Sequence, residues 1–429
     1  MTDPVREGWW QDGLGPAGHD LVRRDADAFL HQTGSSPVVS ALRAVDGIWL
    51  EDADGRRIMD FHGNSCHNIG YGHPAVIAAL KAQLDTLPFC PRRFTNAPAT
   101  ELAERLSALW PHGPARILFG TSGTDAIEMA VKLAYVATGR KTTLAFEDTW
   151  HGAALGAVWI GGRARERAAF PEFQGCVHVP PYWSREPGIS ADDAASASLQ
   201  ALREAFGRDG GFAAMLAEPI RSTPHRPPDW FWPEVRDLCD HTGTLLIFDE
   251  VAVGLGKTGR LYAGEHFPVR PDMTVLGKSL GGAVVPLSAV IARADLNVAG
   301  HLAIGHYTHE KSPLLAAAGL ATLRVLVDQA LADKAQALGG AALSRLQNLA
   351  ARSGLLCGAR GVGLLMALDF APEARNLAPS VQLDCLRRGL NATVSEGRFL
   401  TLSPPLVIDP ADLDRAIDIV EAALDRLCP

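Results

Sequence analysis

The sequence predicts an α/β protein whose core is a mostly parallel sheet with helices on both faces. Five short apolar runs alternate with helical segments: RILFG (116–120), TTLAF (142–146), AAMLAEP (213–219), TLLIFDE (244–250) and MTVLGK (273–278). Apolar runs of this length, separated by helices, are typical of strands buried on both faces. Polar residues or glycine follow each run, and ligands collect at the carboxyl ends of the strands in such sheets. We therefore expect one site at these strand ends.

The segments on either side of this region predict further elements. Residues 20–32 have a short helical pattern, and residues 47–63 read as two strands around an Asp-Gly turn. Helical patterns begin at about residue 74 and at residue 99. After residue 310 the pattern indicates long helices, an extended piece over 359–370 and a C-terminal amphipathic helix.

The composition favours an enzyme of a reducing compartment. The chain has 429 residues and a formal charge of −8. Its Lys and Arg residues are scattered, so no basic patch that would bind nucleic acid is evident. Seven cysteines without a C-x-x-C pair argue against disulfides and structural zinc. The N-terminus, with Asp3 and Glu7, has no apolar signal region, and no run reaches membrane-spanning length. We expect a cytoplasmic enzyme.

The segment GTSGTDAIEMA predicts a strand, a turn of small residues and a helix that opens at Thr124. Ser122 and Asp125 have the spacing of a capping box. Backbone N–H groups at such a helix start, together with the hydroxyls of Ser122 and Thr124 and the small Gly123, suit a phosphate group. The alternative is an ordinary strand–turn–helix unit without a ligand.

Two charged residues follow apolar strands. Asp249 ends LLIFD, where a carboxylate is costly without a partner, so it is either part of a structural ion pair or the partner of a protonated pyridine nitrogen. Lys278 follows VLG and is either a solvated lysine or a nucleophilic amine. A phosphate cup, an aspartate and a lysine at neighbouring strand ends are together what pyridoxal 5′-phosphate (PLP) requires.

The chain resembles the class III, or ω-, aminotransferase family of fold type I PLP enzymes. The resemblance is carried by GYGHP, TSGTDAIEMAVKLA, WHG, AEPI, the long segment from LLIFDE to LGKSLGG, and LSPPLVI, and it runs from about residue 40 to 425. It implies a seven-stranded, mostly parallel sheet in a large domain (73–312). It also implies a small α+β domain formed by part of residues 1–72 and by residues 313–429.

The resemblance also implies roles for individual residues. Lys278 would form the Schiff base and move protons, and Asp249 would bond the ring nitrogen. Val251 and Trp150 would cover the two faces of the ring. The remaining cofactor-binding positions would be Ser122, Gly123, Thr124, His151, Glu218 and, reaching the phosphate of the neighbouring subunit, Thr308. The family implies a homodimer with shared active sites and a small amine as substrate.

Two positions depart from the pattern of family members that use glutamate. These carry an arginine before PPL and a glutamate that shields it, whereas this chain has Thr401 and Thr223. A desolvated pair of arginine and carboxylate is a main source of affinity for such substrates, so its loss disfavours ordinary glutamate-linked transamination. Other polar residues are candidates for contact with substrate: His62, Asn64, His67, Arg92, Arg93, Arg221, His309 and Thr401. Arg92 and Arg93 are equally consistent with a surface or an interface.

Within the family, RDADAFLHQ, MDFHGN, LPFCPRRFTN and GHYTHEKSP resemble the (R)-1-hydroxy-2-aminoethylphosphonate ammonia-lyases. That resemblance favours β-elimination from an amino alcohol, which gives a carbonyl compound and ammonia. The alternatives are an aminotransferase with a keto acid or aldehyde acceptor, an aminomutase and a non-catalytic relative. We expect no metal, because His306 and His309 have no matching third ligand nearby.

Overall fold

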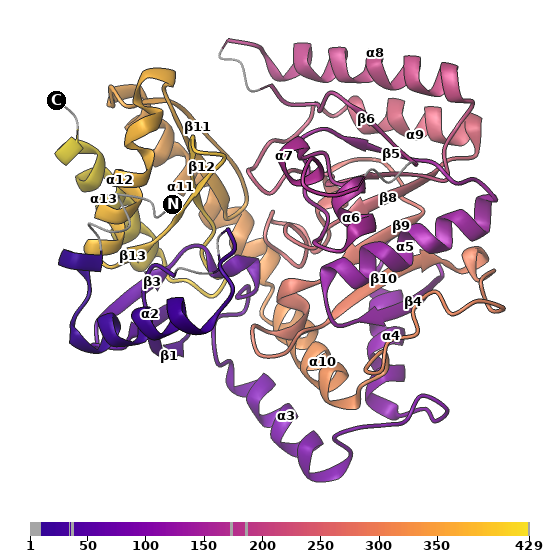
Figure 1. Cartoon of the computed structure of the whole chain (residues 1–429), viewed down its shortest axis with the longest axis horizontal. Coiled ribbons are helices and arrows are strands. Elements are labelled where there is room, and N and C mark those ends of the chain that lie inside the picture. Colours follow the sequence, from indigo (N-terminus) through magenta and orange to yellow (C-terminus); the bar gives the residue numbers. More distant parts are fainter. Residues whose placement is uncertain (1–9, 34, 36–37, 172–174, 185–187, 428–429) are drawn as a thin grey trace. The chain divides into compact units, whose positions relative to one another are not determined.

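A seven-stranded sheet forms the centre of residues 74–333 in the computed structural model of the chain (Figure 1). The strand order is β4-β10-β9-β8-β7-β5-β6. β10 runs antiparallel to both of its neighbours, and the pairs from β9 to β6 are parallel. This sheet confirms the predicted fold class.

The helices and strands of this region are, in chain order, α3 (Pro74–Thr86), α4 (Ala97–Leu109), β4 (Ala115–Gly120), α5 (Gly123–Thr138), β5 (Thr143–Phe146), α6 (Leu155–Ile160), α7 (Ala164–Arg167), β6 (Cys176–Val179), α8 (Ala191–Asp209), β7 (Ala214–Ala217), α9 (Phe231–Thr242), β8 (Leu245–Asp249), η2 (Ala263–His266), β9 (Met273–Leu276), η3 (Lys278–Gly281), β10 (Ser288–Arg293), η4 (Ala294–Leu296) and α10 (Pro313–Asp328).

The structure describes residues 10–33, 35, 38–171, 175–184 and 188–427, which divide into two units. The larger unit is residues 74–333, and the smaller unit consists of the described residues up to 73 and from 334. The boundary predicted after residue 312 lies elsewhere in the structure, because α10 packs against α3 and α4 and belongs to the larger unit. Asp3, Glu7 and Cys428 lie outside the described residues.

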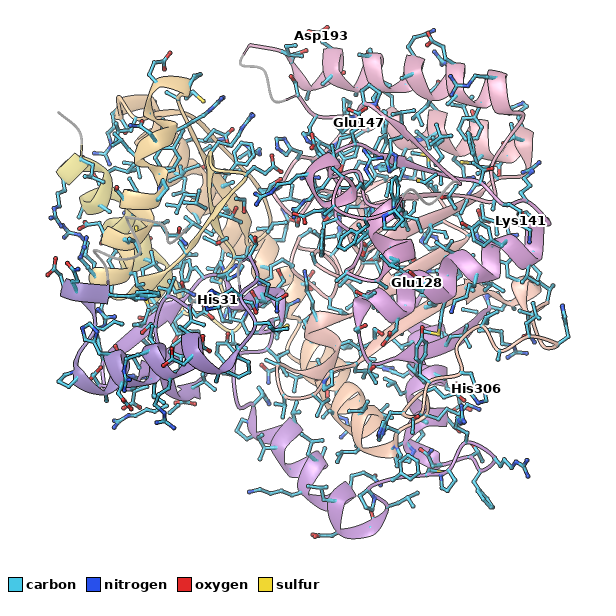
Figure 2. The ribbon with its side chains drawn as sticks, viewed as in Figure 1. His31, Glu128, Lys141, Glu147, Asp193 and His306 are labelled. Atoms are coloured by element: carbon cyan, nitrogen blue, oxygen red, sulfur yellow. The ribbon has the colours of Figure 1, made fainter. Side chains whose placement is uncertain are left out.

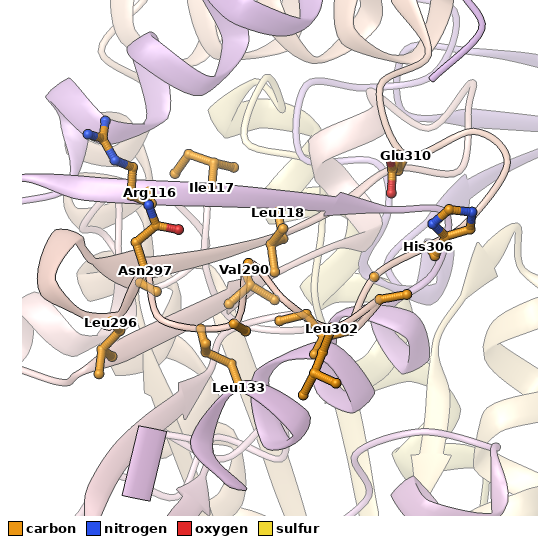
Figure 3. Close-up of a pocket in the computed structure, with 16 residues that line it drawn as sticks. Arg116, Ile117, Leu118, Leu133, Val290, Leu296, Asn297, Leu302, His306 and Glu310 are labelled. Atoms are coloured by element: carbon orange, nitrogen blue, oxygen red, sulfur yellow. The ribbon is translucent and has the colours of Figure 1, made fainter. Parts of the chain in front are cut away.

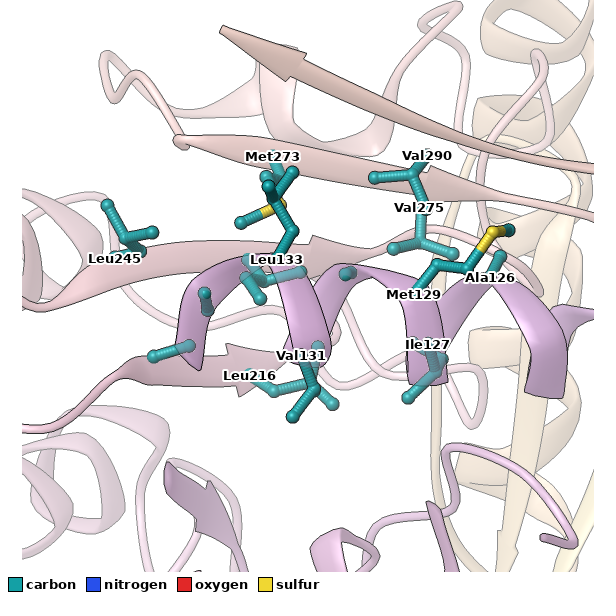
Figure 4. Packing of buried hydrophobic residues seen from close by; sticks show 14 of the residues in the cluster. Ala126, Ile127, Met129, Val131, Leu133, Leu216, Leu245, Met273, Val275 and Val290 are labelled. Atoms are coloured by element: carbon teal, nitrogen blue, oxygen red, sulfur yellow. The ribbon is translucent and has the colours of Figure 1, made fainter. Parts of the chain in front are cut away.

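Helix α5 covers one face of the sheet and carries much of the core. Figure 4 shows its apolar side chains, among them Ile127, Met129 and Leu133, against strand residues such as Val275 and Val290. Ile127, Met129, Val275 and Val290 have no exposed surface, and Leu133 is 5% exposed. The full burial explains why the strands read as continuous apolar runs rather than as alternating patterns.

Two strands of this sheet were not recognised from the sequence. β6 contains only four residues and includes the polar His178, and β10 is a short apolar run that ends at the charged Arg293. β10 pairs antiparallel with β4 along its whole length, from Ser288 opposite Gly120 to Arg293 opposite Ala115. A run of this length is a strand or a helix segment by sequence alone, and only the pairing decides.

The smaller unit holds two four-stranded sheets, in the orders β1-β2-β3-β13 and β11-β12-β15-β14. The predicted hairpin around Asp54–Gly55 is β2 and β3, and the predicted extended piece over 359–370 is divided between β11 and β12. The elements are α2 (Pro16–Ala28), β1 (Leu42–Asp46), β2 (Trp49–Asp52), β3 (Arg57–Asp60), η1 (Gly63–Ser65), β11 (Leu356–Val362), β12 (Leu365–Phe370), η5 (Pro372–Leu377), α12 (Ala378–Arg387), β13 (Leu390–Asn391), β14 (Thr393–Ser395), β15 (Phe399–Leu402) and α13 (Pro410–Leu427), with α11 (Leu331–Arg352) beginning at the boundary.

Several classes of site are absent from the described part of the chain. Its six cysteines are free, and no group of three His, Cys, Asp or Glu side chains could hold a metal ion there. Among the described helices, none is by itself long and apolar enough to cross a membrane, and only the bent pair of α10 and α11 passes that test together.

His178 on β6 is held in its neutral form by the fold. Its Nδ1 lies 2.9 Å from Arg167 Nη1, which can only donate, and its Nε2 lies 3.2 Å from the carbonyl oxygen of Ile160. The ring therefore accepts at Nδ1 and donates at Nε2. Burial, followed by the charge of Arg167, lowers the pKa of His178 to about 4.

We predict that His178 makes the fold sensitive to acid. The unfolded chain takes up the proton near pH 6.5, whereas the folded chain does so only near pH 4, so this contribution to stability is present above pH 6.5 and lost as pH falls to 4. His178→Gln should reduce that loss by about 1–3 kcal/mol in the free energy of unfolding, measured by urea titration at both pH values. His19→Gln, at an exposed position, is the control; equal acid sensitivity of all three proteins would contradict the prediction.

Candidate active site

The polar residues after the parallel strands surround one cavity of about 320 Å³ in the larger unit. Its volume lies at the lower end of the range for small-molecule sites. Nine of the residues singled out in the sequence line it: Gly123, Thr124, Trp150, His151, Glu218, Arg221, Asp249, Val251 and Lys278. The expectation that the strand ends form a single site therefore agrees with their positions.

The start of helix α5 forms one wall of the cavity. Ser122 is its N-cap, and its Oγ accepts a hydrogen bond of 3.0 Å from the backbone N–H of Asp125. The Asp125 carboxylate bonds the N–H and hydroxyl of Thr121, one residue earlier than a capping box would require. Glu128, labelled in Figure 2, accepts from the N–H of Ala157 and so ties α6 to α5.

Asp249 lies buried at the end of β8 with two hydrogen-bond donors. Its Oδ2 is 2.7 Å from His151 Nδ1, and its Oδ1 accepts from the N–H of Val251 at 3.0 Å. Because the carboxylate accepts, His151 Nδ1 carries a proton. His151 Nε2 is buried and has no hydrogen-bond partner within the residues that the structure describes, so it is available to an atom of a ligand in the cavity.

Val251 fits closely against two glycines. A Cβ on Gly123 would lie 2.9 Å from Val251 Cγ1, and a Cβ on Gly277 would lie 3.2 Å from the same atom. Real side chains do not approach at the first distance, so a residue larger than glycine at position 123 displaces Val251. The two glycines therefore set how far Val251 stands from the opposite wall of the cavity.

Lys278 begins the short helix η3 with a backbone φ of +43°. Residues other than glycine rarely adopt a positive φ, and strained backbone of this kind concentrates at functional sites. The side chain is exposed and lines the cavity. The fold therefore accepts local strain to place this lysine after β9.

Glu218 and Arg221 come from one loop after β7 that is fixed at several points. The carbonyl oxygen of Glu218 accepts from Tyr182 Oη at 3.2 Å, and that of Pro219 accepts from the Trp232 indole at 2.9 Å. Burial raises the pKa of the Glu218 carboxyl, while the nearby Arg221 charge lowers it and the Asp249 charge raises it again. Burial is the largest of these effects, so the protonated form of Glu218 is favoured relative to a glutamate in water.

The Arg221 guanidinium is held in a defined orientation. Its Nε donates to Thr223 Oγ1 at 3.0 Å and its Nη2 to the carbonyl of Asp148 at 2.7 Å. Its Cζ lies 4.3 Å from the centroid of the Trp183 ring. Thr223, noted in the sequence as a departure from the family pattern, thus provides a hydroxyl that positions Arg221.

Arg163 also lines the cavity and was not singled out from the sequence. It precedes α7, is exposed, and its Cζ lies 5.3 Å from the centroid of the Trp150 ring. Trp150 is itself 42% exposed. The basic segment RARER reads as solvated surface, and only the path of the loop after α6 places its first arginine at the cavity.

Two candidate residues of the smaller unit, His62 and Asn64, lie at one strained turn. Gly63, Asn64 and Ser65 all have positive φ, and the backbone N–H groups of His62 and Gly63 bond the Asp60 carboxylate at 3.0 and 3.1 Å. Strain in consecutive residues is consistent with a functional loop.

His67 does not suit the substrate role that the sequence suggested. Its side chain is fully buried, and its Nε2 lies 3.1 Å from the carbonyl oxygen of Asp60. A Cβ on Gly63 would lie 2.5 Å from the His67 ring, so the ring fills the space beneath the turn. We revise its role to support of the turn.

Thr401 is a buried residue of β15 in the smaller unit. Its hydroxyl lies 3.1 Å from the hydroxyl of Ser395 on β14, and the two residues belong to paired strands. The side chain therefore contributes a neutral hydroxyl where the family pattern has a cation.

Arg92 and Arg93 are exposed in the larger unit and do not line the cavity that contains Lys278. Arg92 Nη1 donates to the carbonyl of His306 at 3.4 Å. Of the two interpretations left open for these arginines, the surface or interface position matches the geometry within this chain.

The segment GHYTHEKSP lies beside a second cavity of about 370 Å³, drawn in Figure 3. Aliphatic side chains such as Leu118 and Leu302 form its middle, with Arg116 near one end and His306 and Glu310 near the other (Figure 3). Thr308 and His309 are exposed, and the centroid of the His309 ring lies 5.4 Å from that of the Phe89 ring. The lining is largely aliphatic and includes neither Lys278 nor Asp249, so this cavity is separate from the one at the strand ends.

Comparisons with known proteins agree with this geometry. The pattern of the aminotransferase class-III family matches residues 31–424. The chain is 35% identical, over 100% of its length and 94% of the relative, to the (R)-1-hydroxy-2-aminoethylphosphonate ammonia-lyase of Vibrio splendidus. It is 30% identical to the acetylornithine aminotransferase of Methanosarcina mazei, covering 99% of this chain and 100% of that enzyme. A PLP-bound amine transaminase from an uncultivated Pseudomonas species has a TM-score of 0.87 and 30% identity over 94% of this chain and 99% of that chain.

We predict that Gly123→Ala weakens PLP binding about tenfold or more, because the new Cβ pushes Val251 into the cavity and overpacking of this kind costs about 1–3 kcal/mol. Titration of the apoenzyme with PLP, followed by absorbance, measures the effect. Gly207→Ala on α8 is the matched control, because a Cβ there meets nothing within 4 Å. Equal PLP affinity of both variants would show that Val251 does not set the width of the cavity.

Proposed function

This chain belongs to the class-III aminotransferase family and is an enzyme that uses PLP, and we propose that it releases the amino group of a small, polar amino alcohol as ammonia. The observation that carries the proposal is the similarity to an ammonia-lyase along the whole chain, at 35% identity, whereas three acetylornithine aminotransferases are 28–32% identical to it. The threonines at 223 and 401 support it, because neither provides the charged group that a glutamate-linked transaminase uses.

The residues of the cavity fit the cofactor. Asp249, oriented by His151, would hold the proton of the pyridine nitrogen, and the backbone N–H groups at the start of α5 would bind the phosphate. Val251 and Trp150 would cover the ring. When bound, PLP supplies a carbonyl that combines with an amine and a ring that accepts the electron pair left by proton removal.

Lys278 is the base of the proposed reaction. Its Nζ removes the proton from the carbon that carries the amine, and the electron pair left behind expels the β-hydroxyl, which leaves as water after protonation. One water is then consumed when the carbon–nitrogen bond is hydrolysed. The net reaction converts one amino alcohol into one carbonyl compound and one ammonia, so atoms and electrons balance without an oxidant.

Transamination is the second candidate, because the same residues support it and the family contains aminotransferases. In that case Lys278 returns the proton elsewhere and the amino group passes to a keto acid or aldehyde. An aminomutase would move the amino group from its original carbon to the neighbouring one. These outcomes differ in products and not in the residues required.

The test is incubation with 1-hydroxy-2-aminoethylphosphonate in the absence of any keto acid. We predict steady release of ammonia over many turnovers, and we predict that Lys278→Ala lowers the rate about 100- to 10,000-fold. At most one equivalent of product, with turnover restored only by pyruvate, would instead identify an aminotransferase. Rearranged amine without ammonia would identify an aminomutase.

We also propose that the active form is a homodimer in which Thr308 of one subunit reaches the cofactor phosphate of the other. The exposed position of Thr308 supports this, as does the anchoring of its segment by the bond from Asn96 Nδ2 to the carbonyl of Lys311 at 2.9 Å. Analytical ultracentrifugation of the PLP-bound enzyme should give twice the protomer mass of 45.7 kDa, and a single protomer at all concentrations would refute the proposal.

A further inference from the structure

The cavity has more positive groups than the cofactor needs. Its lining includes the cations Arg163, Arg221 and Lys278 and the carboxylates Glu218 and Asp249. Both carboxylates already have partners: Asp249 Oδ2 lies 2.7 Å from His151 Nδ1, and Glu218 Oε1 accepts from the N–H of Ser222 at 3.1 Å. Lys278, Asp249 and the start of α5 account for the amine, the ring nitrogen and the phosphate of PLP. The two arginines are left without a role in that set.

The two arginines share a geometry, although they come from different loops. Arg163 Cζ lies 5.3 Å from the Trp150 ring centroid and Arg221 Cζ lies 4.3 Å from the Trp183 ring centroid. Stacking on an indole uses the face of a guanidinium group, whereas hydrogen bonds to an anion use its edge. Each guanidinium therefore lies over an indole, and an anion can be bound through N–H groups that do not face the ring.

Their burial differs in a way that suits entry of a charged ligand. Arg221 is 3% exposed and is oriented by Thr223 and by the carbonyl of Asp148. Arg163 is exposed and precedes the short helix α7. A buried, fixed cation strengthens the binding of an anion because the local dielectric is low, and an exposed cation attracts the anion from solvent.

We infer that Arg163 and Arg221 form a subsite for the anionic head group of the substrate, and that this head group is a phosphonate. Two guanidinium groups from separate loops suit a tetrahedral dianion, whose three oxygens accept hydrogen bonds from more than one direction. The subsite replaces the missing arginine before PPL as the source of affinity for the acid end of the substrate. This inference rests on the proposed function, because it assumes that the amine end of the substrate meets Lys278.

The test measures binding and needs no elimination. The probes are 2-aminoethylphosphonate, β-alanine and ethanolamine, which carry a phosphonate, a carboxylate and no anion, and binding to the PLP-bound enzyme is followed by the change in cofactor absorbance. We expect Arg163→Gln to weaken the binding of 2-aminoethylphosphonate about tenfold, and Arg221→Lys to weaken it about 10- to 100-fold. The affinity for ethanolamine should change less than twofold in both variants. The two anionic probes, 2-aminoethylphosphonate and β-alanine, carry no β-hydroxyl and cannot undergo the proposed elimination, so their binding stays interpretable if the lyase proposal fails.

Arg165→Gln is the matched control, since it removes a charge two residues from Arg163 at an exposed position that does not line the cavity. It should leave all three affinities unchanged, and all variants should retain PLP. The subsite would be overturned if the arginine variants bound all three probes equally more weakly, or if Arg165→Gln weakened probe binding as much as they do. Loss of PLP from Arg163→Gln would overturn it too. β-Alanine bound as tightly as the phosphonate, with the same losses, would overturn the assignment to phosphonate. If Arg221→Lys does not fold, Arg163→Gln decides alone.

Discussion

The buried carboxylate of Asp249 is the constraint on which the active site depends. Removing a charge from water costs several kcal/mol unless a partner and hydrogen bonds compensate. Here the partners are His151 Nδ1 at 2.7 Å and the N–H of Val251 at 3.0 Å. The first of these contacts ties the loop after β5 to the end of β8, and Trp150 lies on that loop beside His151. The need to satisfy one carboxylate therefore positions both walls of the cavity.

Much of this site could be predicted because its residues follow short apolar strands in the sequence. Asp249 is the last residue of its strand, and Lys278 and Ser122 each stand two residues beyond the end of a strand. Parallel strands bring their carboxyl ends together whatever the intervening helices do. The helix cap at Ser122 could also be predicted, because a cap is a local contact between residues three positions apart, here Ser122 and Asp125.

The rest depends on contacts between distant segments. Arg163 belongs to a basic run that resembles solvated surface, and its place at the cavity follows from stacking on Trp150 and from the path of the loop after α6. His67 stands among polar residues and suggested a ligand contact, yet the close approach of Gly63 leaves it buried under a turn. The limit between the two units was misplaced because the packing of α10 on α3 and α4 has no local signal. Spacing along the chain carries no information about such contacts.

We expect Lys278 to be the amine that joins the chain to PLP, in preference to Lys257 or Lys311 in neighbouring segments of the sequence. The most direct measurement is reduction of the PLP-bound enzyme with borohydride, followed by mass spectrometry of its peptides. We predict a pyridoxyl group on the peptide that contains Lys278 and on no other. The same group on the peptide of Lys257 or Lys311, or no labelled peptide from a protein that binds PLP, would contradict it.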